Sequence, residues 1–211
     1  MNVITTAVPF LTITPDSRRA GMGEAGVAST ADANSVYWNA AALAFVEKKA
    51  AISNSYAPWL RQLVPGISFN SVSGYSKINK RSVIGGSMRF FTFGDINFTD
   101  DAGNPLGTFK PSSYALDICY GTQLSKHWAI GADLKYINDN LAGTRPINGI
   151  TPKVGRSGAG DISALYKGSK KAKIGGETKE LRYSFGVNLQ NLGAKITYSD
   201  KNNKEFIPAN F

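Results

Sequence analysis

Residues 128–138 read WAIGADLKYIN, and this stretch decides the fold class because apolar and polar residues alternate along it. The even positions from Trp128 to Tyr136 are apolar, while Gly131, Asp133 and Lys135 stand between them. Successive side chains of a β-strand point to opposite sides, so the pattern predicts a strand with one apolar and one polar face. Its length of about 11 residues suits a tilted strand that crosses a membrane.

Residues 114–120 and 181–189 carry the same alternation. Aromatic residues stand near the ends of these apolar faces, where the two membrane interfaces of an outer-membrane barrel would lie. A soluble β-sandwich would show the same alternation with its apolar face turned inward, so alternation alone does not separate the two architectures. The strand lengths and the aromatic positions favour an all-β, antiparallel transmembrane barrel of the outer membrane.

The alternation continues along most of the chain after residue 46. It predicts strands at about 49–58, 66–77, 81–94, 112–124, 127–138, 159–168 and 179–192. The shorter connections are 77–81, 123–127 and 168–179, and the long polar ones are 94–111, 138–160 and 193–208. Outer-membrane barrels have short periplasmic turns and long outer loops, which places the long connections on the cell surface. Residues 206–211 read like the start of an eighth strand, so we expect further strands beyond this chain.

The segment before the strands, residues 14–46, has no two-residue alternation and is rich in small residues. Residues 21–26 match the dinucleotide-binding pattern G-x-G-x-x-G, but no buried strand precedes them and no βαβ unit follows. We therefore predict a compact plug that packs inside the barrel. The residues expected to hold it together are Gly21, Gly23, Gly26, Asp32, Asn34, Trp38 and Asn39.

Several motifs of the N-terminal region resemble one known family. AVPFL at 7–11, PDSR at 15–18, GMGEAGVA at 21–28 and DANSVYWN at 32–39 are similar to the start of the PorV family. These are outer-membrane barrel proteins of the Bacteroidetes type IX secretion system and belong to the broader FadL-like group. The similarity continues through residues 56–60 to residues 191–198 and 206–210, although Asn39-Ala40-Ala41 replaces the Asn-Pro-Ala of the wider group.

The resemblance implies a FadL-like barrel of about 14 strands when complete. This chain would be its N-terminal half, with a plug at 1–46 and the first barrel strands at 47–211. Because Met1 stands almost on the start of the similarity, we expect that a signal peptide was removed and a start methionine added.

The resemblance also implies a function in protein secretion at the cell outer membrane. Such a barrel would bind the C-terminal signal domain of secreted cargo and carry it from the translocon to the surface attachment complex. The implied partners are the translocon barrel, the surface signal peptidase and attachment complex, the cargo C-terminal domains, and lipopolysaccharide or lipid. Apolar residues in the outer loops are the candidate contacts, because exposed apolar patches often mark interfaces. These residues are Phe98, Leu106, Phe109, Ile147 and Ile150.

Other functions are less well supported by the sequence. One cysteine and one histidine leave too few ligands for a Cys/His metal site, and the carboxylates show no motif spacing for acid–base catalysis. We predict no enzyme activity, no cofactor and no catalytic residue. The formal net charge of +9 is spread over turns rather than one stripe, so nucleic acid is not an expected partner. A FadL-like channel for hydrophobic small molecules stays open, and Gly85-Gly86 would then mark a kink in the barrel wall.

Overall fold

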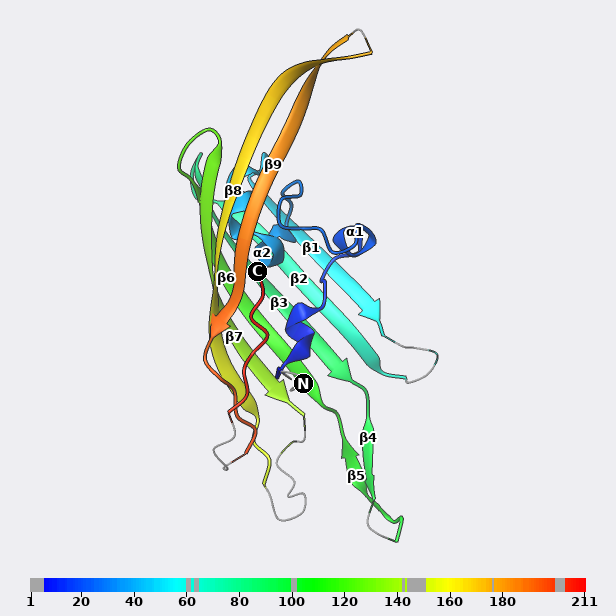
Figure 1. Ribbon diagram of the computed structural model, residues 1–211. Coiled ribbons are helices and arrows are strands. Elements are labelled where there is room, and N and C mark those ends of the chain that lie inside the picture. Colours follow the sequence, from blue (N-terminus) through cyan, green and yellow to red (C-terminus); the bar gives the residue numbers. More distant parts are fainter. Residues whose placement is uncertain are drawn as a thin grey trace, which may run out of the picture.

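A single curled sheet of seven antiparallel strands dominates the computed structural model (Figure 1). The structure describes residues 6–59, 62, 65–99, 102–141, 143, 151–175, 177–199 and 204–211. The strand order is β1-β2-β3-β6-β7-β8-β9, so each strand pairs with its neighbour along the chain apart from a short inserted hairpin. The strands are β1 (Ala50–Pro58), β2 (Ile67–Lys77), β3 (Ser82–Phe93), β6 (Ser112–Gln123), β7 (Trp128–Asn140), β8 (Gly155–Ile174) and β9 (Glu177–Gly193).

The predicted strands are confirmed, with ends that differ from the prediction by only one or two residues except in β8. That strand was predicted at 159–168 and extends over 155–174. Its ends lack apolar alternation, but they pair with β7 at one end and with β9 at the other. The pairing with β9 shifts between Gly160 and Ile162, next to Asn191, whose φ is +58°.

The apolar faces of the strands point away from the curled interior. Ile52 and Leu134 are exposed over 79% and 70% of their surface, whereas Ala115 and Ala129 on the opposite faces are fully buried. The soluble sandwich is therefore the wrong architecture for this chain, because its apolar faces would point inward. The sheet has the arrangement of a partial barrel with an apolar exterior and a small, polar interior.

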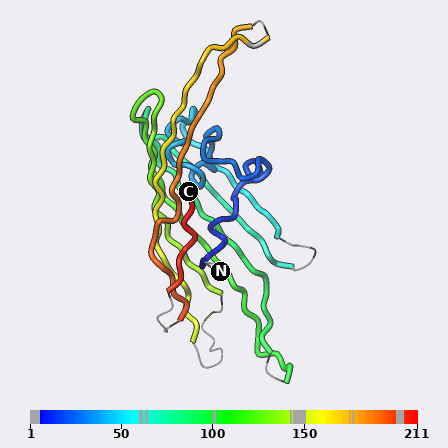
Figure 2. The backbone as a smooth tube through the Cα atoms, viewed as in Figure 1, coloured from blue at the N-terminus to red at the C-terminus, as the bar shows by residue number. Residues whose placement is uncertain are grey.

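The N-terminal segment packs against the concave side of the sheet (Figures 1 and 2). Its elements are η1 (Pro9–Thr12), α1 (Ser17–Gly21), α2 (Ser35–Trp38) and η2 (Ala40–Phe45). Leu43 of η2 is fully buried in a cluster with Tyr75 and Val83 of the sheet. Among the described residues, no helix has the length and apolar character needed to span a membrane.

Two predicted connections differ from expectation. The long polar connection predicted at 94–111 contains a second small sheet of β4 (Ile96–Thr99) and β5 (Pro105–Phe109), which projects beyond the end of the large sheet (Figure 1). Residues 206–211 do not form a regular eighth strand. They make an isolated antiparallel bridge between Gln190 and Asn210, and Ile207 packs into a cluster with Phe10 in the N-terminal segment.

Candidate functional site

A buried arginine organises the plug from within. Arg19 lies in α1 with its side chain fully buried, and its guanidinium bonds Asp32 at 2.9 Å and Ser29 at 2.9 Å. Asp16 caps the same helix by accepting the Arg19 backbone N–H at 2.9 Å. The second Asp16 oxygen accepts a 2.9 Å hydrogen bond from the Trp38 indole. A buried charge is tolerated only when it is paired and hydrogen-bonded, and this network meets that condition.

The three predicted glycines of the plug have different surroundings. A Cβ on Gly26 would overlap the indole of Trp38, so the glycine leaves room for that ring. At Gly21 and Gly23 a Cβ would meet nothing within 4 Å. Gly23 instead adopts a φ of +72°, a conformation that a glycine adopts without strain.

The two predicted asparagines reach the barrel wall. The Asn39 amide donates to the carbonyl of Val27 at 2.9 Å and to that of Ala164 in β8 at 3.2 Å. The Asn34 side chain accepts a 2.9 Å hydrogen bond from Ser73 in β2. The structure therefore brings Gly26, Asp32, Trp38 and Asn39 into one packed unit, and it places Asn34 at the unit's contact with β2.

Polar residues of β8 and β9 complete the attachment of the plug, and the sequence did not single them out. Gln190 donates to the Tyr37 carbonyl at 2.6 Å, and Asn188 donates to the Trp38 carbonyl at 2.8 Å. Ser163 accepts the backbone N–H of Ala41 at 3.1 Å. These three polar residues stand at the inward positions of strands whose side chains alternate between the two faces. That alternation is the one feature of the sequence that could have identified them.

Glycines of the wall let η2 lie directly on the sheet. A Cβ on Gly121 or Gly131 would overlap the backbone of Ala40, so only a residue without a side chain fits there. A Cβ on Gly85 would come within 3.1 Å of Leu43. At Gly85-Gly86, where a channel would have a kink in its wall, β3 pairs with β2 and β6 in unbroken register, so no bulge interrupts the strand there.

A cluster of charged residues fills the interior below η2. Arg89 bonds Asp117 at 3.3 Å, and Lys135 bonds Asp161 at 3.2 Å. Lys135 also lies 3.7 Å from Asp117 and donates to Asn191 at 2.7 Å. All these side chains except Asn191 carry charge, so the cluster joins four strands of the wall, β3, β6, β7 and β8, by buried interactions that salt screens little.

The cluster also holds the plug. Arg89 donates to the carbonyl of Leu11 at 3.1 Å, and its guanidinium lies 5.0 Å from the ring centroid of Tyr37. Burial raises the pKa of the Tyr37 phenol although Arg89 opposes this, so the hydroxyl keeps its proton and donates to Leu11 at 3.4 Å. Asp133 is buried beside the cluster, and neither of its carboxylate oxygens has a hydrogen-bond partner within the described part of the chain.

Three of the candidate partner-contact residues, Phe98, Leu106 and Phe109, lie at the other end of the sheet from η2. Phe98 and Phe109 are half-buried in the β4–β5 hairpin, and Leu106 is exposed over 55% of its surface. Ile147 and Ile150 lie outside the described residues. Within the described ranges, no group of three or more His, Cys, Asp or Glu side chains could hold a metal ion.

The comparison with protein families decides the identity of the chain. The family described as Type IX secretion system protein PorV matches residues 1–211. The chain belongs to the PorV family. Membership makes it a component of the type IX secretion system, and the curled sheet with an apolar exterior fits the outer-membrane barrel of PorV proteins. Known PorV proteins are secretion components rather than a family of enzymes. A search of curated proteins finds no match.

Proposed function

We propose that this PorV-family chain binds the C-terminal signal domain of secreted cargo and carries it from the translocon to the surface attachment complex. The family match over the whole chain carries the proposal. We further propose that the chain lies in the cell outer membrane, with residues 1–46 as the plug and residues 47–211 as barrel strands. Its partners would be the translocon barrel, the signal peptidase and attachment complex, and lipopolysaccharide.

The position of the plug supports a role for the outer loops in recognition. Plug residues bond strands on both sides of the concave interior, from Ser73 in β2 to Gln190 in β9. A folded cargo domain has no path through an interior occupied in this way. Contacts with cargo would therefore be made outside the sheet, and the β4–β5 hairpin is the described outer element that projects farthest (Figure 1). Leu106 offers an exposed apolar side chain there.

An affinity purification tests the proposal. The tagged protein would be recovered from detergent-solubilised outer membranes, and mass spectrometry would identify the bound proteins and lipids. We expect a large translocon barrel, a surface peptidase and several cargo proteins that share one C-terminal domain. Recovery of the barrel alone with a stoichiometric fatty acid would contradict the secretion role and favour the small-molecule channel.

The purification needs a control against nonspecific capture. A variant with Leu106→Asp and Phe98→Asp changes the proposed contact hairpin and leaves the plug attachment untouched. We expect the cargo proteins to disappear from its eluate. An unrelated tagged outer-membrane barrel from the same cells shows which proteins bind any barrel, and cargo found equally in that eluate would not count as support.

A further inference from the structure

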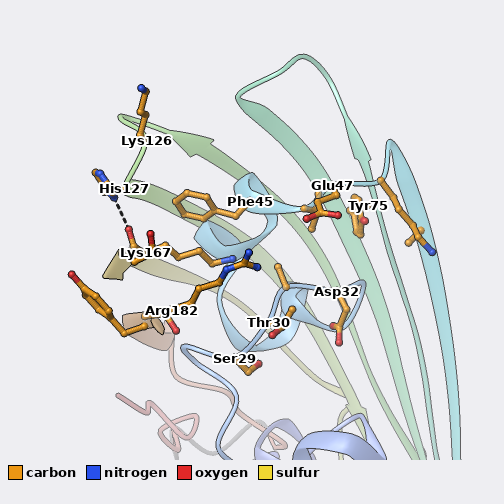
Figure 3. A pocket seen from close by; sticks show the side chains of 18 of the residues that line it. Ser29, Thr30, Asp32, Phe45, Glu47, Tyr75, Lys126, His127, Lys167 and Arg182 are labelled. Carbon is orange, nitrogen blue, oxygen red and sulfur yellow. Dashed lines mark hydrogen bonds between the residues drawn. The ribbon is translucent and has the colours of Figure 1, made fainter. Parts of the chain in front are cut away.

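A pocket of about 850 Å³ opens between the plug and the end of the sheet that carries the short turns (Figure 3). One side is formed by plug residues, among them Thr30 and Phe45, and the other by the ends of β8 and β9. In Figure 3, the side chains of Lys167 and Arg182 extend from the strands towards Phe45 and Thr30. The pocket is separate from the outer loops, which lie at the opposite end of the sheet.

Three lysines line this pocket, Lys48, Lys126 and Lys167. Lys167 is half-buried, and its ammonium group lies 4.9 Å from the ring centroid of Phe45. In the described part of the chain, Lys167, Lys48 and Lys126 form no ion pair with any carboxylate. Glu47 attracts the Lys167 ammonium group electrostatically but makes no direct ion pair with it, so this group is available to an incoming anion.

The acidic residues of the pocket are mostly engaged elsewhere. Asp32 is paired with Arg19 at 2.9 Å inside the plug. Glu180 is paired with Arg182 at 3.1 Å. Glu47 forms no ion pair among the described residues but interacts electrostatically with Lys167, so this single carboxylate faces the three lysines of the pocket. The electrostatic balance therefore favours an anionic ligand.

Strands β8 and β9 extend this basic surface beyond the pocket. They reach past the turn at 124–127 and form a two-stranded arm (Figure 1). Positions 167, 169, 171 and 173 share the inward side of β8, because side chains alternate along a strand. Lys171 and Lys173 therefore continue the row that begins with Lys167, and Glu180 of β9 stands directly opposite Lys171. The outward side of the arm's base carries apolar residues instead, with Tyr183 and Phe185 exposed over 40% and 66% of their surface.

We propose that the pocket and the inward side of the arm bind an acidic polypeptide segment of a partner protein. The lysines outnumber the two carboxylates that face them, Glu47 and Glu180, and they form a row that is longer than a single headgroup and leads into the pocket. They face the space over the plug, whereas lipid would meet the outward side with Tyr183 and Phe185. Charge complementarity and this orientation favour a polypeptide over an anionic lipid. The site lies at the plug end of the sheet and does not depend on the proposed recognition of cargo.

Fluorescence anisotropy with a labelled poly-glutamate peptide tests the site on the detergent-purified protein. We expect saturable binding that weakens with added salt. The double variant Lys167→Gln/Lys171→Gln should weaken binding about tenfold, because two ion pairs of about 0.2–1 kcal/mol each are lost. The second variant, Lys171→Gln/Lys173→Gln, changes exposed residues only and should also weaken binding. It tests the proposal even if the protein does not fold without Lys167.

The matched control is Lys170→Gln/Lys179→Gln, which removes the same charge from the outward side of the same arm. We expect its affinity to stay close to that of the unchanged protein. Equal losses in the inward and outward variants would overturn the proposal, because binding would then follow net charge alone. Absence of peptide binding would also overturn it, as would binding of phosphatidylglycerol vesicles that depends on Lys167 and Lys171 and excludes the peptide.

Discussion

The Trp38 indole donates a 2.9 Å hydrogen bond to the carboxylate of Asp16, which also caps the helix that carries Arg19. This contact joins two parts of the plug that are 22 residues apart in the sequence. The ring of Trp38 also covers Gly26 and is 8% exposed. One side chain therefore links the first helix, the glycine-rich turn and the segment that leads to η2.

Replacement of Trp38 by alanine should lower the free energy of unfolding by about 3–5 kcal/mol, because a buried ring is lost and a cavity is left. Trp38→Phe keeps most of the packing and removes only the indole donor, so it should cost about 1 kcal/mol. Guanidinium titration in detergent micelles would measure both values. An unfolding midpoint of Trp38→Ala equal to that of the unchanged protein would show that the plug does not depend on this ring.

The contact between Gly131 and the backbone of Ala40 gives a second prediction. Gly131→Ala should destabilise the protein by about 1–3 kcal/mol, since the added methyl group forces η2 away from the wall. Gly158→Ala is the matched control on the outward side of the sheet, where the nearest atom to a new Cβ is 3.8 Å away. Protease sensitivity of the plug would report the displacement. Equal sensitivity in the two variants would argue that η2 does not need the glycine.

Arg89 and Asp117 provide the third prediction. Arg89→Met should cost about 3–5 kcal/mol, because it leaves the buried Asp117 charge with fewer partners. Adding Asp117→Asn should recover part of that loss, since the unpaired charge is then removed as well. Unfolding titrations of Arg89→Met, Asp117→Asn and the double variant give the four free energies of a double-mutant cycle, with the unchanged protein as the reference. Additive losses in the double variant would mean that the two side chains do not stabilise each other.

The strand pattern was predictable because one face of each strand meets an apolar surrounding. Residues 128–138 and 181–189 show the resulting alternation of apolar and polar residues, and β7 and β9 cover these two stretches. The ends of β8 have no such pattern, and their pairing with β7 and β9 determines them. The short β4–β5 hairpin has too few alternating residues to stand out from a loop.

The interior contacts were less predictable than the strands. Asp117, Lys135 and Asp161 lie on adjacent strands, and only the register brings their side chains together. The sequence gives no register between neighbouring strands. The compact plug was predictable from its small residues, but the arginine at its centre was not. Arg19 reads as a surface residue until the fold surrounds it with Asp16, Ser29 and Asp32.

The exposed side chain of Leu106 gives the last prediction, which rests on the proposed binding of cargo. Leu106→Asp should weaken binding of a purified cargo C-terminal domain about tenfold, because one buried leucine contributes about 1.5–3 kcal/mol to an interface. Biolayer interferometry with the immobilised barrel would measure the change. Leu124→Asp is the matched control, since Leu124 is exposed to a similar extent, 59%, in a turn at the opposite end of the sheet.

The two leucine variants separate recognition by the outer hairpin from general effects on the barrel. Both introduce the same charge on an exposed apolar position, so both should change solubility and detergent binding to a similar degree. Only Leu106→Asp alters the β4–β5 hairpin, which projects beyond the end of the large sheet (Figure 1). If cargo affinity fell equally in both variants, the loss would come from the added charge rather than from the contact. The β4–β5 hairpin would then have no role in recognising cargo.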